Sequence, residues 1–155
     1  MHFFAHTAAS NVGVEWLGNA LSEVNYWAVL WAVVSSLVVG SIWYHEKVFG
    51  PAWRSAIGLK KKDMESTEGM GAMFGGTIIF NAFTAAFLQA VMLATETSGV
   101  NNGLILGAIF GLVFAGFPHV VHALFERKNS TYFGLALGHD VLTFAVMGGV
   151  LGAFV

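Results

Sequence analysis

The sequence contains no cysteine and little charge. Cysteine is absent from all 155 residues, which excludes disulfide bonds, thiolate metal ligands and a cysteine nucleophile. Only 10% of the residues are charged and 56% are hydrophobic, whereas about one quarter of a soluble domain is charged. A net charge of −2 offers no basic surface for nucleic acid. The composition therefore predicts a polytopic membrane protein whose first partner is the lipid bilayer.

The motifs of common catalytic sites are missing as well. The sequence has no phosphate-binding loop, no nucleophile elbow and no HExxH zinc motif. Ser35 and Ser36 lie in the middle of an apolar stretch without a base at matching depth, and we expect Ser35 to make a hydrogen bond across helices. We therefore expect a non-catalytic protein: an accessory or interaction subunit of a larger membrane complex, a homo-oligomer, or a small binding protein.

Four apolar stretches are each long enough to cross a hydrocarbon core about 30 Å thick. Backbone groups in lipid must pair within their own segment, so each stretch should be a helix. Short connections make the second, third and fourth stretches antiparallel neighbours. The predicted fold is all-α, with one integral membrane domain over residues 1–155. It is a four-transmembrane-helix bundle with spans at about residues 24–43, 71–95, 103–124 and 132–155.

The basic residues indicate the orientation of these spans. All seven lie in the first and third connections: Lys47, Arg54, Lys60, Lys61, Lys62, Arg127 and Lys128. Cytoplasmic loops of membrane proteins carry an excess of lysine and arginine. The pattern therefore predicts a protein of the bacterial inner membrane with both termini outside.

The first connection contains a further predicted helix. Pro51 suits the first turn of a helix and Gly58 suits its end. We expect a short cytoplasmic interfacial helix between spans one and two, anchored at the lipid headgroups by Trp53, Lys60, Lys61 and Lys62. Before span one, residues 11–24 form either a second interfacial helix or an extension of that span.

Small residues recur at every fourth position of the spans. Span three carries such a ladder, and span four carries another at its end: Gly103, Gly107, Gly111 and Ala115, then Gly148 and Gly152. Small residues at this spacing let helix backbones approach closely in lipid. Dimerisation and packing within one chain would both use them, and four helices in one chain favour the second.

Ionisable side chains gather near one end of the predicted bundle. Asn129 lies in the connection between spans three and four. His119 precedes it by ten residues and His139 follows it by ten, so the two histidines should lie at the same depth in this antiparallel pair. The whole cluster comes from three spans: His45 and Glu46 from span one, His119, His122 and Glu126 from span three, His139 and Asp140 from span four. Ionisable residues at membrane depth are costly and mark functional sites.

Three hypotheses explain this cluster. The first is structural, with histidines and carboxylates joining the helices. The second is a metal, haem or quinone site on imidazole and carboxylate groups: His119, His122, His139 and Asp140. The third is a path for proton-coupled, ion or small-solute transport by an oligomer, which would continue along span two through Thr77, Asn81, Thr84 and Gln89.

Several motifs resemble those of the DUF1761 family of small four-span membrane proteins. One group is similar to its G-x-x-W-Y…F-G-x-x-W…G signature: Gly40, Trp43, Tyr44, Phe49, Gly50, Trp53 and Gly58. Residues 124–127, 138–139 and 147–148 resemble its second half, which implies that Glu126 and His139 belong to a shared pattern. Where the family often has serine-proline after the tyrosine, this chain has His45-Glu46. The resemblance implies the four-span architecture and no particular activity. By composition alone, Trp43 and Tyr44 fit the aromatic belt of a membrane interface.

Overall fold

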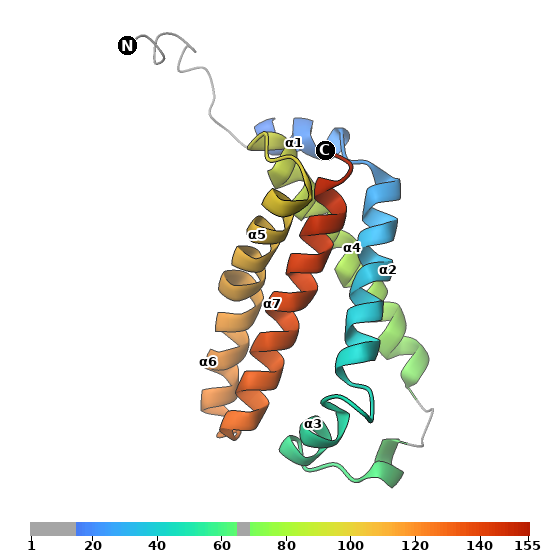
Figure 1. Ribbon diagram of the computed structural model, residues 1–155, viewed down its shortest axis with the longest axis vertical. Coiled ribbons are helices and arrows are strands. Elements are labelled where there is room, and N and C mark those ends of the chain that lie inside the picture. The colour runs from blue at the N-terminus through green and yellow to red at the C-terminus, as the bar shows by residue number, and fades with distance from the viewer. Residues whose placement is uncertain (1–14, 65–68) are drawn as a thin grey trace.

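A computed structural model describes residues 15–64 and 69–155, and within these ranges every regular element is a helix (Figure 1). The predicted all-α fold is therefore confirmed. Residues 1–14, the start of the predicted domain, lie outside the described residues. Four helical segments are long and apolar enough to cross a membrane, which is compatible with an integral membrane protein. They are α2 (Tyr26–Trp43), α4 (Met70–Ala94), the continuous Val100–Phe125 and α7 (Ser130–Gly152).

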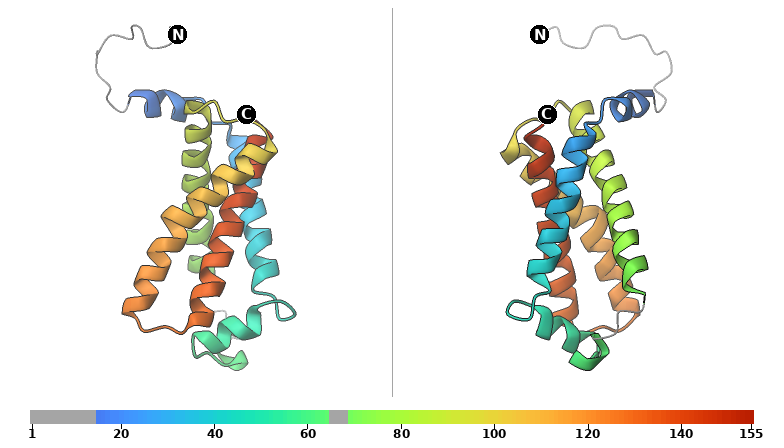
Figure 2. Two further views of the ribbon diagram at one scale, coloured as in Figure 1. Left: turned by 60° about the vertical axis from the view of Figure 1, so that its left-hand side comes forward. Right: turned by 90° about the vertical axis from the view of Figure 1, so that its right-hand side faces the viewer.

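The central helix of the arrangement is α7. It contacts α2 and α4, and also all three parts of the third long segment (Figures 1 and 2). These parts are α5 (Val100–Phe110), η2 (Gly111–Gly116) and α6 (Phe117–Phe125).

Shorter helices lie at the two ends of the long ones. α1 (Glu15–Ser22) lies across one end, near the C-terminus, and packs on α4 (Figure 2). It is separate from α2, because the Asn25 side chain accepts a hydrogen bond from the Trp27 N–H at 3.0 Å and starts a new helix. Residues 11–24 are thus not an extension of span one within the described part.

α3 (Gly50–Ala56) and the single 3₁₀ turn η1 (Lys61–Met64) lie at the opposite end (Figure 1). The predicted boundaries of α3 are confirmed: Pro51 is in its first turn, and Gly58 follows its end with φ of +76°. All seven lysine and arginine residues lie in the connections at this end, which we call the basic end.

The backbones of α5 and α7 touch directly. A β-carbon on Gly103 would overlap the backbone of Gly148, and one on Gly148 would overlap that of Gly103. Gly107 has the same relation to the backbone of Phe144. The predicted small-residue ladders therefore pack against each other within one chain, as glycine permits at close helix crossings.

The ladder of the third segment changes register at η2. This element is a stretch of π-helix that ends just before Pro118. Proline has no N–H to donate to the preceding turn, and a π turn accommodates the defect with one extra residue. The prediction of Ala115 as the next ladder residue is therefore wrong: Gly116 is buried instead, and its β-carbon would meet the side chain of Leu137.

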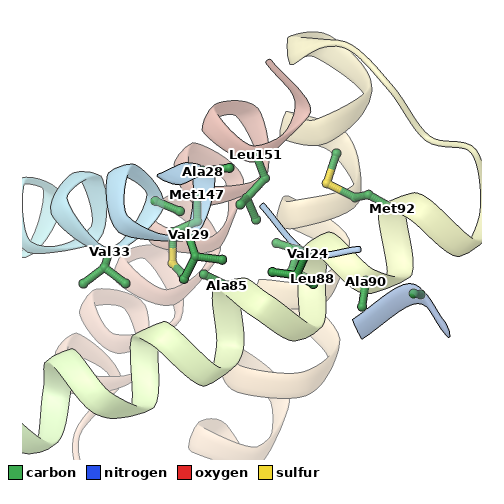
Figure 3. Close-up of a cluster of buried hydrophobic side chains, with 12 residues drawn as sticks. Val24, Ala28, Val29, Val33, Ala85, Leu88, Ala90, Met92, Met147 and Leu151 are labelled. Carbon is green, nitrogen blue, oxygen red and sulfur yellow. The ribbon is translucent and has the colours of Figure 1, made fainter. Parts of the chain in front are cut away.

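A hydrophobic core fills the half of the helices away from the basic end. Figure 3 shows side chains of α2, α4 and α7 pointing toward one another there, with Met147 and Leu151 fully buried. Ala28 and Ala85 are also fully buried and keep the helices close. The last buried apolar residue of α2 is Val33, and its buried polar residue, Ser36, follows three positions later.

The contact between α5 and α7 gives a stability prediction. Gly107→Leu should destabilise the fold by roughly 1–3 kcal/mol or more, because an added side chain has backbone in its way. Gly75→Leu is the matched control, since a β-carbon on Gly75 meets nothing within 4 Å. Thermal unfolding in detergent measures both, and equal melting temperatures would contradict the close contact.

Candidate functional site

A cavity of about 520 Å³ lies between α2, α4 and α7, in the half of the molecule toward the basic end. Apolar side chains such as Leu37, Phe74 and Phe144 form part of its wall. The polar part of its lining comes from all three helices: Ser36, Ser41 and Tyr44, then Thr77 and Asn81, then His139, Asp140 and Thr143. We call this space the polar cavity.

Motif residues of the first segment surround His139. The ring of Tyr44 lies 4.9 Å from the His139 ring, and the ring of Trp43 lies 6.2 Å from it. A β-carbon on Gly40 would come within 3.6 Å of His139 Nε2. Trp43 covers Gly138, whose β-carbon would be 3.1 Å from the indole ring. The G-x-x-W-Y motif and the Gly-His pair therefore form one local structure.

The turn after Tyr44 carries the next part of the motif. The Phe49 N–H donates to the Trp43 carbonyl at 3.1 Å, and the Gly50 N–H donates to the His45 carbonyl at 3.1 Å. The Phe49 ring lies 4.6 Å from the Trp43 ring. This turn returns the chain to α3 and places Trp53 beside Tyr44, with the ring centres 5.1 Å apart.

Asp140 is the charged group of the polar cavity. Its side chain is 14% exposed and forms a hydrogen bond with His119, with 2.6 Å between Oδ2 and Nδ1. A β-carbon on Gly111 would lie 2.8 Å from the Asp140 carbonyl oxygen, so the third segment touches α7 at this level. The π turn that starts at Gly111 then brings His119 to Asp140. The predicted proximity of His119, His139 and Asp140 is confirmed.

His139 continues the polar contacts along α7. Its Nδ1 lies 3.4 Å from Asp140 Oδ1, and its Nε2 lies 3.4 Å from the Thr143 hydroxyl. The Thr143 residue is buried, at 6% exposure. His119, Asp140, His139 and Thr143 thus form a chain of polar groups from the flank of α6 into the polar cavity.

One hydrogen bond across helices closes the cavity toward the core. Asn81 Nδ2 donates to Ser36 Oγ at 2.8 Å, which joins α4 to α2. The Ser35 hydroxyl instead donates to the Ala32 carbonyl of its own helix, so the prediction of a hydrogen bond across helices from Ser35 is wrong. Ser36 takes that role because it is on the buried face of α2, with 3% exposure.

The other members of the predicted cluster lie apart from this site. His45 accepts the Lys47 N–H at 3.1 Å in the turn after α2. His122 is exposed on α6, and Glu126 lies 3.7 Å from the Lys128 ammonium. Glu46 pairs with Arg54 of α3, and this hydrogen bond lowers the pKa of Glu46. The structure therefore separates these four residues from the other three, of which His139 and Asp140 line the polar cavity and His119 contacts Asp140.

The predicted polar path along α4 is also divided. Thr77 and Asn81 line the polar cavity, and Thr77 donates its hydroxyl to the Met73 carbonyl at 2.8 Å. Thr84 lines a different space. Gln89 is buried and accepts the Asn25 N–H at 2.9 Å, which fixes the start of α2 at the far end. Transport through these groups stays a prediction.

Metal binding stays a prediction as well. Within residues 15–64 and 69–155, no group of three or more histidine and acidic side chains is arranged to hold a metal ion. Three imidazole and carboxylate groups meet, and they contact one another in a row: His119, Asp140 and His139.

The residues predicted to anchor the interfacial helix differ in exposure. Lys60, Lys61 and Lys62 are exposed, whereas Trp53 is half-buried against Tyr44.

Tyr44 and Thr143 are residues of the site that the sequence alone did not predict. Tyr44 fitted an aromatic belt, yet its ring packs on His139 and its residue lines the polar cavity. The signal that could have identified it was the G-x-x-W-Y spacing. Thr143 stands four residues after His139, on the same face of α7, and this spacing could have identified it.

The environment of Tyr44 gives a titration prediction. Burial, with a smaller effect of the Asp140 charge, raises the pKa of Tyr44 to about 12. Because folding raises this pKa, the contribution of Tyr44 to the free energy of unfolding is complete below a pH of about 10, the pKa of tyrosine in the unfolded chain. That effect is lost as the pH rises from about 10 to about 12. The ultraviolet difference between wild type and Tyr44→Phe should show tyrosinate with a midpoint near pH 12. A midpoint near pH 10 in folded protein would contradict this environment.

Comparison with known proteins agrees with the motif geometry. Residues 27–152 match the DUF1761 family, which is described as a protein of unknown function. No curated protein and no solved structure matches the chain. The match covers the last three long segments, all of the first except Tyr26, and every residue that lines the polar cavity. The chain belongs to the DUF1761 family.

Proposed function

We propose that this chain is an integral membrane protein that binds a small ligand in the polar cavity. The observation that carries the proposal is the convergence of Asn81, His139, Asp140 and Thr143 on one space within the long helices. Polar groups are costly in a membrane and are placed there where they serve a site. A cavity of a few hundred Å³ with a few directed polar groups is typical of small-molecule sites.

The contrast between the two halves of the molecule supports this proposal. Away from the basic end, buried apolar side chains such as Leu88 and Met147 pack between α2, α4 and α7. Toward the basic end the same three helices enclose about 520 Å³ of space. Gly40 contributes no side chain there, which keeps His139 accessible from the cavity.

The chemistry of the lining supports binding without catalysis. Asp140 is held by His119, and the groups that remain are one imidazole, one amide and several hydroxyls. These groups donate and accept hydrogen bonds and would orient a polar ligand. We therefore propose a small membrane binding protein, and the polar cavity is its site.

We also propose an orientation in the membrane. The seven basic residues at the α3 end support a cytoplasmic basic end, with both termini outside in a bacterial inner membrane. Because the chain has no cysteine, single cysteines report position directly. In intact cells, Ser98→Cys should react with a membrane-impermeant maleimide, whereas Lys61→Cys should react only after lysis. The reverse pattern would invert the proposed orientation.

The binding proposal has its own test. Protein purified gently from its native membrane should carry a non-protein molecule, detected by native mass spectrometry, absorption spectrum or elemental content. Gly40→Leu should abolish it, because the new side chain would extend into the polar cavity. Gly71→Leu, at an open position of α4, should retain it. Identical content in wild type and Gly40→Leu would contradict the proposal.

A further inference from the structure

We infer that the ligand is an amphiphile of the quinone class, with its planar head in the polar cavity and its apolar tail in a neighbouring groove. This inference rests on the proposed function and specifies its ligand. Its basis is a second cavity, of about 420 Å³, between α4, the third segment and α7. We call it the phenylalanine groove, and it is lined by Phe83, Thr84, Phe87, Phe110, Phe114 and Phe144.

The two cavities are neighbours along the same pair of helices. Phe144 of α7 lines both of them. On α4, Thr77 and Asn81 line the polar cavity, and Thr84 lines the phenylalanine groove. Residues at this spacing share one helix face. A single elongated molecule that follows this face of α4 would therefore occupy a polar space first and an apolar space next.

The position of the polar cavity below the membrane surface favours an uncharged head. Asp140 is ten residues after Ser130, the first residue of α7, which places it about 15 Å along the helix at 1.5 Å per residue. A phospholipid keeps its charged headgroup at the membrane surface, outside a hydrocarbon core about 30 Å thick. Tyr44 packs on His139 and directly follows the last residue of α2, so the polar cavity begins at the basic-end limit of that helix and extends inward to Asn81. A head that leaves the membrane surface to reach Asn81 beside the carboxylate of Asp140 is favoured to be small and uncharged.

The lining selects a planar head with acceptor oxygens. The rings of Tyr44, Phe74 and Phe144 form walls on which a flat ring can pack. The hydroxyls of Thr143 and Tyr44 can donate to a carbonyl oxygen, as can a protonated ring nitrogen of His139. The negative charge of Asp140 disfavours an anionic head. A quinone ring meets all three conditions.

The phenylalanine groove suits the tail and gives it a way in. Five of its six lining residues are phenylalanine, and the sixth is Thr84. Phe83 is 72% exposed and Phe114 is 66% exposed, so the groove opens on the flank of the helices. In a membrane that flank faces lipid tails, and an apolar tail could enter from there without crossing water.

Two quinones test this inference on the purified full chain. The probes are decylubiquinone and the same ring without its decyl tail, and their Kd values come from titration followed by native mass spectrometry. Decylubiquinone should bind wild type at least about tenfold more tightly than the tail-less ring, because only the probe with a tail contacts the phenylalanine groove.

Variants assign the head and the tail to their cavities. Thr143→Val should weaken binding of both probes about tenfold through loss of one buried hydroxyl. Thr84→Trp should weaken only decylubiquinone, because it fills the phenylalanine groove. Ile79→Trp, at an exposed position of α4 that lines neither cavity, is its control. Phe114→Ala removes an exposed wall of the groove and should also weaken only decylubiquinone.

Two results would overturn the inference. Equal affinity for both probes, unchanged by Thr84→Trp and Phe114→Ala, would exclude a role of the phenylalanine groove and leave a ligand of the polar cavity alone. No saturable binding of decylubiquinone to folded wild type would exclude the quinone class. Neither result decides the proposed function, which the Gly40→Leu comparison tests without any added quinone.

Discussion

The direct contact between the backbones of α5 and α7 is the constraint on which the rest of the structure depends. Gly103 and Gly107 bring α5 to the distance at which a β-carbon would no longer fit. Because α7 is the central helix, this contact fixes its height and rotation relative to the third segment. The level at which Gly111 meets the Asp140 backbone follows from the same contact. A membrane protein gains little from burying apolar surface out of lipid, so close packing of small residues carries much of the association between helices.

The π turn at η2 links the contact between α5 and α7 to the polar site, because it sets the rotation of α6 relative to α7. An uninterrupted α-helix would keep Ala115 on the contact face, whereas the extra residue before Pro118 places Gly116 there instead. The following turn then brings His119 to Asp140. A carboxylate enclosed by helices is costly without a partner, and the imidazole meets that need. The local defect in the helix is thus the reason that the polar groups of two segments meet, as is common for π turns at functional sites.

The motif residues form one local structure around His139. Gly40, Trp43 and Tyr44 contact it or cover its neighbour Gly138, and the Phe49-Gly50 turn returns the chain so that Trp53 supports Tyr44. The same helices that enclose the polar cavity form the apolar core at their other half, where Met147 and Leu151 replace His139 and Asp140 on α7. A packed half beside a half that encloses a cavity is an arrangement suited to holding a ligand in a preformed site.

Hydropathy and charge alone determined the helical class, the four long segments to within a few residues, the short α3 and the gathering of basic residues at one end, because lipid forces backbone pairing within each segment. Spacing alone also predicted that His119 and His139 lie at one depth, and that Asp140 lies at the same end of the helices. Only the tertiary structure decided which polar groups share a site. Helix rotation, the π turn and the path of the turn after Tyr44 all depend on contacts distant in sequence. These contacts separate Gln89 and Glu126 from the site, and they bring Tyr44 and Thr143 into it.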